Sequence, residues 1–67
     1  MVKIETIEKF EGKYITVDYS DGQVTGTLTE IDTDTIPNEI TVDWETGFQV
    51  IPICDIQGIS IEKNPMK

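Results

Sequence analysis

Carboxylates are the most numerous reactive groups in this chain of 67 residues, which holds 13 Asp and Glu against five Lys and has a formal net charge of −8. The chain has no His, and this excludes imidazole acid–base catalysis and metal binding through His. It has no Arg, so it lacks the guanidinium group that binds phosphate through two parallel hydrogen bonds. Its single Cys, Cys54, permits neither an internal disulfide nor a zinc site made of thiolates.

Pairs of carboxylates on neighbouring strands are one candidate for catalysis. Asp18 with Asp43, or Glu30 with Glu45, supply the two acidic groups that a glycosidase uses as acid and base. That reaction needs a deep cleft, and a chain this short has little room for one. We therefore expect these acids to be solvated strand residues, and we expect no catalytic residues and no enzymatic activity.

The segment 32–39 is the best candidate for a metal site. It offers four oxygen-bearing side chains, those of Asp32, Asp34, Asn38 and Glu39. A calcium loop, however, needs an oxygen ligand where Ile36 stands and a Gly where Pro37 stands. We therefore expect a solvated acidic loop, with no metal and no cofactor. Because no His is present to activate the thiol of Cys54, we expect that residue to be buried as a small apolar side chain.

The elements that hold these residues are predicted to be strands. Eleven Ile, five Val and nine Thr make the chain rich in β-branched residues, which favour pleated structure. Only residues 2–11 depart from this pattern, because Ile4, Ile7 and Phe10 are three apart and suit one face of a short helix. Gly12 is then the left-handed stop. A first strand through Val2 and Ile4 is the alternative.

Residues 13–61 are predicted to form five strands of a small barrel within a single domain, 1–67. Ile15, Val17 and Tyr19 share the inward face of the first strand, and Ser20-Asp21-Gly22 turns the chain into the second. In the second strand Val24, Gly26 and Leu28 point inward, but Ile31 has the opposite parity. This predicts a bulge or bend near Glu30, with Gly26 as the residue at which a curved strand relaxes.

The second half of the chain alternates less clearly. A loop over 32–38 leads to a strand in which Trp44 is in phase with Ile40 and Val42, so we expect Trp44 in the core. Tyr14 is out of phase with the inward residues of the first strand and is the better candidate for an exposed aromatic residue. A turn at 45–47, a strand over 48–53, one helical turn at 54–58, a strand over 59–61 and a tail at 62–67 complete the prediction.

Two sequence stretches resemble a known family. The first is Ile15-x-Val17-x-Tyr19-x-x-Gly22-x-Val24-x-Gly26-x-Leu28-x-x-Ile31-Asp32, which is similar to the first motif of Sm, Lsm and Hfq-type proteins. The second is Val50-x-Pro52-x-x-Asp55-Ile56-x-x-Ile59, which resembles the stretch entering the last strand, notably in the Sm-like domain of bacterial ribosome-maturation factors. The resemblance implies an all-β fold, a small five-stranded Sm-like, SH3-type barrel with a bent second strand and a short N-terminal helix.

The resemblance also implies a mode of assembly and a ligand. Sm-like rings pair the fourth strand of one subunit with the fifth strand of the next. Ile51 and Ile53 are expected on the outward face of the fourth strand, opposite Phe48 and Val50. We therefore expect self-association through Val50, Ile51, Ile53, Ile59 and Ile61, which the charge of −8 per subunit limits to a dimer or prevents altogether. In the family, an Asn and an apolar neighbour bind RNA together with a basic residue in the last loop. Asn38 and Ile36 are the nearest counterparts here, but they lie about two residues too far from Asp32, and Cys54 and Asp55 stand where the family has the basic residue.

Charge placement indicates a different partner. Between residues 14 and 62 the chain has ten acids and no Lys or Arg, whereas nucleic-acid binders use Lys and Arg to contact phosphates. We therefore predict a non-enzymatic acidic interaction module that binds a basic protein surface, either as an adaptor or as a nucleic-acid mimic of the kind that phages and mobile elements encode. The predicted contact residues are Asp18, Asp21, Asp32, Asp34, Asp43, Glu45 and Tyr14. The alternative is an Sm-like ring that binds RNA or a nucleotide through Ile36, Asn38 and Tyr14.

No membrane segment is expected. The chain has no apolar run near the length of about 20 residues that a membrane helix requires, and acids occupy the N-terminal region where a signal peptide would be apolar. We therefore expect a cytoplasmic protein.

Overall fold

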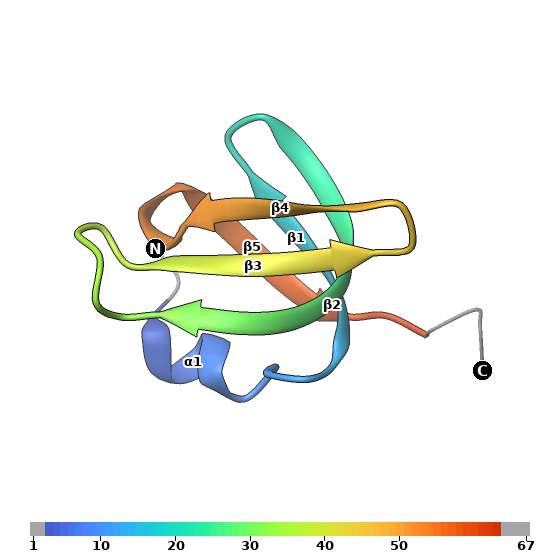
Figure 1. Cartoon of the computed structure of the whole chain (residues 1–67), viewed down its shortest axis with the longest axis horizontal. Helices are drawn as coiled ribbons and strands as arrows, with labels where there is room; N and C mark the ends of the chain where they lie inside the picture. Colours follow the sequence, from blue (N-terminus) through green and yellow to red (C-terminus); the bar gives the residue numbers. More distant parts are fainter. Residues whose placement is uncertain (1–2, 64–67) are drawn as a thin grey trace.

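The computed structural model describes residues 3–63 and has one short helix and five antiparallel strands (Figure 1). The elements are α1 (Ile4–Glu8), β1 (Tyr14–Tyr19), β2 (Gly22–Asp32), β3 (Glu39–Trp44), β4 (Gly47–Pro52), the single 3₁₀ turn η1 (Ile53–Asp55) and β5 (Ile56–Ile61). The predicted all-β fold with a short N-terminal helix is confirmed. Most of the predicted tail, 62–67, lies outside the described residues, as does Val2.

The helix α1 forms because Ile7 has a buried site to occupy. A helix of five residues is too short to be stable alone in water. Ile7 is completely buried, and Ile4 and Phe10 pack against the same core at the spacing of three that the sequence shows. Gly12 then adopts a left-handed φ of 81°, and its N–H donates to the Leu28 carbonyl at 2.8 Å. The helix is confirmed over the alternative of a first strand.

The hairpin of β1 and β2 follows the predicted alternation. Ile15 and Val17 are fully buried, and Tyr19 packs against the core from the end of the strand. Ser20 and Asp21 make a two-residue turn, after which Gly22 takes a φ of 130° that side-chain-bearing residues rarely adopt.

The strand β2 bends between two halves of the sheet, as predicted. Its pairing with β3 shifts register between Leu28 and Glu30, which leaves Thr29 as the extra residue of a bulge. The bulge lets both Leu28 and Ile31 face the core although their parity differs. At Gly26 the backbone of β3 comes so close that a Cβ atom would overlap the Asp43 carbonyl oxygen. The absence of a side chain at Gly26 therefore permits this close approach of the two strands.

The sheet bends strongly but does not close. Its strand order is β4-β3-β2-β1-β5, so β4 and β5 are the two edges although only η1 separates them in the chain. The strand β5 begins at Ile56, three residues before the predicted start at Ile59. The predicted small five-stranded barrel is present as an open, curved sheet, with α1 below β2 in the view of Figure 1.

The core is one apolar cluster enclosed by the curved sheet. It consists of Ile7, Ile15, Val17, Leu28, Ile40, Val42, Ile51, Ile53 and Ile56. The prediction that Ile51 and Ile53 face outward is wrong. The two-residue turn at Glu45 and Thr46 sets a register that pairs Ile51 with the inward-facing Ile40. Because side chains alternate between the two faces along a strand, Phe48 and Val50 then face outward.

The prediction that Trp44 lies in the core is also wrong, since 37% of this residue is exposed. Trp44 has the inward parity of Ile40 and Val42, but it is the last residue of β3. The pairing of β2 with β3 reaches only to Thr27 and Asp43, so no β2 residue covers it. The indole instead lies over Gly47, where an added Cβ atom would be 3.5 Å from the indole nitrogen.

Candidate functional site

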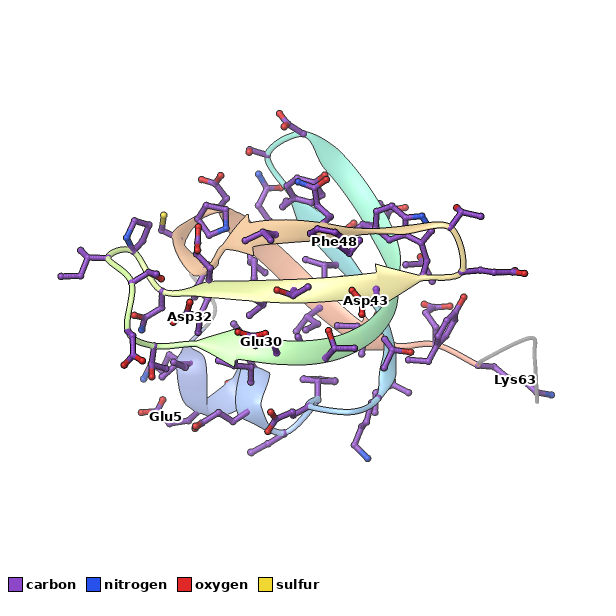
Figure 2. All side chains as sticks on the ribbon, in the orientation of Figure 1. Glu5, Glu30, Asp32, Asp43, Phe48 and Lys63 are labelled. Carbon is purple, nitrogen blue, oxygen red and sulfur yellow. The ribbon has the colours of Figure 1, made fainter. Side chains whose placement is uncertain are left out.

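The outward surface of β2, β3 and β4 is built from three rows of residues that the strand register aligns. The rows are Thr27–Asp43–Phe48, Glu30–Thr41–Val50 and Asp32–Glu39–Pro52. We call these nine residues the β2–β4 face. Figure 2 shows Glu30, Asp32, Asp43 and Phe48 together on the side turned to the viewer. The face is thus formed by side chains that alternate with the buried residues of the same strands.

Four carboxylates lie on the β2–β4 face, from Glu30, Asp32, Glu39 and Asp43. The face contains no Lys, and the basic residues of the described chain, Lys3, Lys9, Lys13 and Lys63, lie before β1 or after β5. Four like charges on adjacent strands produce a negative potential that attracts a cationic partner and repels phosphates.

An apolar row borders these acids along β4. Phe48 is 65% exposed and Val50 is 38% exposed, and Pro52 continues the same row toward the β2–β3 loop. Exposed aromatic residues next to polar ones are typical of the centres of protein interfaces. Sequence reasoning assigned the outward apolar row to Ile51 and Ile53, and the structure assigns it to Phe48, Val50 and Pro52.

The six acids predicted as one contact surface occupy several places. Asp43 and Asp32 are on the β2–β4 face, whereas Asp18 and Asp21 are at the β1–β2 hairpin, Asp34 is in the loop after β2 and Glu45 is in the β3–β4 turn. Asp18 accepts a hydrogen bond from the Gln23 side chain at 2.6 Å. The structure therefore distributes the predicted set over the β2–β4 face, the β1–β2 hairpin, the loop after β2 and the β3–β4 turn.

Sequence reasoning missed Glu30 and Glu39 as members of the acidic surface. The alternation along β3 would have placed Glu39 on the outward surface, because Glu39 lies two residues before Thr41 and four before the outward-facing Asp43. Glu30 was harder to place because the bulge at Thr29 resets the parity of β2. Tyr14, predicted to be exposed, is half-buried and pairs with Thr27, so it extends the first row of the face on the β1 side.

The loop between β2 and β3 presents one apolar residue to solvent. Ile36 is fully exposed, while the backbone of Asn38 is tied to the sheet because its carbonyl accepts from the Ile53 N–H at 2.8 Å. Asp32 accepts from the Asp34 N–H at 2.9 Å, which orders the start of the loop. Within residues 3–63, no three Asp, Glu or Cys side chains converge to form a site that would hold a metal ion.

Cys54 is exposed, which corrects the prediction that it is buried. It is the middle residue of η1, and the neighbouring Ile53 and Ile56 take the positions that point into the core. A 3₁₀ turn of three residues directs its middle side chain to a different side from the residues that flank it.

The two edges of the sheet carry backbone groups that no neighbouring described strand pairs. Trp44 and Gly47 flank the two-residue turn, so they form a hydrogen-bonded pair, and the ladder then alternates. Phe48 and Val50 therefore direct their N–H and C=O groups away from β3. On the other edge the Glu62 N–H donates to the Tyr14 carbonyl at 2.9 Å, and the same alternation leaves Ile59 and Ile61 facing away from β1.

Among the described residues, no helix is long and apolar enough to cross a membrane. Comparison of the chain with protein-family models, with curated proteins and with solved structures finds no match.

Proposed function

We propose that this chain is a non-enzymatic acidic interaction module that binds a basic surface of another protein. The observation that carries the proposal is the composition of the β2–β4 face, where four carboxylates lie beside the exposed Phe48 and Val50 without a cation among them. The charges attract a basic partner over a distance and speed its association. The apolar row supplies contact area, which holds the partner once it has arrived.

One form of this function is mimicry of nucleic-acid charge. A basic groove that normally contacts phosphates is a suitable partner for rows of carboxylates, and the module then blocks that groove. The acids at the β1–β2 hairpin, Asp18 and Asp21, extend the negative field to a second side of the molecule. An adaptor that joins a basic protein to another component uses the same charges without blocking a groove.

The proposed family is that of Sm-like domains. A short helix, a hairpin, a long bent second strand, a second hairpin and a one-turn connection before the last strand occur in the order that the resemblance implies. Self-association through the edges also remains a prediction. Its contact residues are now Val50 on β4 and Ile59 and Ile61 on β5, because Ile51 and Ile53 belong to the core.

A second candidate function is an Sm-like ring that binds RNA or a nucleotide. This second function is favoured by Ile36, which is fully exposed and lies two residues before Asn38. An exposed apolar side chain in this loop is available to stack on a base. Tyr14, the third residue of this candidate, lies on β1 and pairs with Thr27 rather than with residues of the loop.

Solution mass and binding together separate the two functions. Light scattering gives the mass, and titrations at low salt give the affinities for oligo-U, for oligo-A and for poly-L-lysine. We expect a monomer or dimer that binds poly-L-lysine and ignores both RNAs. A large ring with micromolar affinity for RNA would contradict the proposed module and favour the second candidate.

A matched pair of variants locates the binding surface. The substitutions Glu39→Gln and Asp43→Asn together remove two charges from the β2–β4 face. Asp18→Asn and Asp21→Asn together remove two charges from the β1–β2 hairpin. We expect the first pair to weaken the binding of poly-L-lysine more than the second. Equal losses would mean that only total charge matters and that the β2–β4 face is not the site.

A further inference from the structure

The free edge of β4 is the feature from which a binding mode follows. The backbone N–H and C=O groups of Phe48 and Val50 point away from β3, as the ladder alternation requires. The Val50 carbonyl accepts a hydrogen bond from the side chain of Gln49 at 3.3 Å, which agrees with a carbonyl that β3 does not pair. Exposed edges of this kind add strands from other chains unless they are blocked. Pro52, at the end of β4, limits the open edge to these two residues.

The outward side of an added strand would meet the apolar row first and the acids behind it. Neighbouring strands are about 4.8 Å apart, so the acids on β3 are about 10 Å from an added strand. Only a long side chain spans that distance, and Lys and Arg do so by laying an apolar stem along the surface with the charged end extended. Phe48 and Val50 would lie under the stems, and Asp43 and Glu39 would receive the charges.

The inward side of an added strand would lie beside Gln49, the exposed inward residue of β4. Gln49 pairs with the buried Val42 and so has inward parity, yet it is exposed. On β5, Ile61 pairs with the buried Ile15, and it is 62% exposed although it too has inward parity. One residue of inward parity is thus exposed at each edge of the sheet, whereas Ile51, the next inward residue of β4, is fully buried. Apolar residues at the inward positions of an added strand would extend the core.

We propose that the β4 edge binds an extended segment of a partner protein in which Lys or Arg alternates with apolar residues, as a sixth strand of the sheet. This inference rests on the proposed function and names the chemistry of its partner. A second copy of this chain is the poorer occupant. Its own free strand, β5, has no Lys or Arg between Ile56 and Ile61, and each copy brings a net charge of −8.

Amide hydrogen exchange, followed by NMR on the 67-residue chain, tests the binding mode without any substitution. The probe is a short synthetic peptide that alternates Lys and Val, and the control peptide has the same composition with all Lys before all Val. We expect the amides of Phe48 and Val50, which exchange rapidly in the free protein, to become protected with the alternating peptide and not with the control. Protection of Ile59 and Ile61 instead would overturn the assignment of the edge.

Proline substitutions at the two edges supply a matched control. Val50→Pro removes the edge N–H of β4, and Ile61→Pro removes an edge N–H of β5 at another exposed apolar residue. We expect Val50→Pro to lower the affinity for the alternating peptide by about five- to tenfold, which is the effect of one lost hydrogen bond. Ile61→Pro should change this affinity by less than about twofold. Equal effects would contradict the proposal.

Charge variants test the reach of the cationic side chains. Asp43→Asn removes a carboxylate from the row behind β4, whereas Glu5→Gln removes one from the helix α1. We expect only Asp43→Asn to lower the affinity for the alternating peptide and to make this affinity less sensitive to the salt concentration.

The outcomes separate this inference from the function on which it rests. Binding of both peptides with no protection at Phe48 and Val50 would overturn strand addition and leave the acidic module intact. Binding of neither peptide would overturn both. Protection of Phe48 and Val50 that rises with protein concentration in the absence of peptide would identify a second copy as the occupant.

Discussion

Gly26 lies where the backbones of β2 and β3 approach each other closely, at the end of their pairing. A Cβ atom there would overlap the carbonyl oxygen of Asp43 and approach its carbonyl carbon to 2.9 Å, and neither group can move without shifting β3. We expect Gly26→Ala to lower the free energy of unfolding by about 2 to 3 kcal/mol, as overpacking against rigid atoms does. Chemical denaturation followed by circular dichroism measures this loss.

Gly58 is the matched control, because it is also a strand glycine. An added Cβ atom would meet only the Asp18 carboxylate, at an ordinary 3.5 Å. Gly58→Ala is expected to change the stability by less than about 0.5 kcal/mol. If both variants were equally stable, the close approach of β2 and β3 would not limit the fold.

Cys54 supports a second prediction at this scale. Because its side chain is exposed, iodoacetamide should alkylate the thiol in the native protein at nearly the rate that it does in denaturant. Mass spectrometry of timed samples measures both rates. Reaction only after unfolding would show that the thiol is covered in solution.

Among the elements, α1 depends most on a single side chain. Ile7 is fully buried, and a helix of five residues has little stability of its own. We expect Ile7→Ala to lower the free energy of unfolding by about 3 kcal/mol and the milder Ile7→Val to lower it by about 1 kcal/mol. Thermal unfolding of both variants checks the order and keeps the test informative if the Ala variant does not fold.

Ile36→Ala provides the control at a fully exposed isoleucine. The same atoms are removed, but no buried contact is lost, so the stability should stay within about 0.5 kcal/mol of the parent. A comparable loss at Ile36 and Ile7 would contradict the packing of α1 against the sheet.

At the scale of the whole molecule, unbalanced charge opposes folding. The net charge of −8 is confined to a body of 34 × 21 × 21 Å, so many of its acids are closer together than the Debye length of about 30 Å at 10 mM salt. At about 150 mM salt this length falls to about 8 Å, and the repulsion is screened. We expect sodium chloride over this range to raise the midpoint of thermal unfolding by about 5 °C, which corresponds to about 1 kcal/mol.

A variant with less charge is the control for this effect. Removing two acids by Asp18→Asn and Asp21→Asn should raise the midpoint at low salt and reduce the rise that salt produces. A midpoint that is insensitive to salt in both proteins would show that repulsion contributes little to the stability.

Alternation predicted the inward face wherever only one face of a strand is apolar. Ile15 and Val17 in β1, and Ile40 and Val42 in β3, are buried as their spacing indicates. In β4 both faces are apolar, so the period of two does not distinguish Phe48 from Ile51. The pairing of Ile51 with Ile40, set by a two-residue turn, decided that Phe48 belongs to the outward surface.

The sequence by itself determined the five strands, the short helix, the bulge in β2 and the lack of cations between residues 14 and 62. These are local or compositional properties, which depend on spacing and side-chain type alone. Only the tertiary structure decided that Trp44 and Cys54 are exposed, that Glu30 and Glu39 join Asp43 on one surface, and that β4 and β5 are the edges of the sheet formed by residues 3–63. Each of these depends on how far a neighbouring strand extends and on the register at which it pairs, and both are set by contacts between residues distant in the sequence.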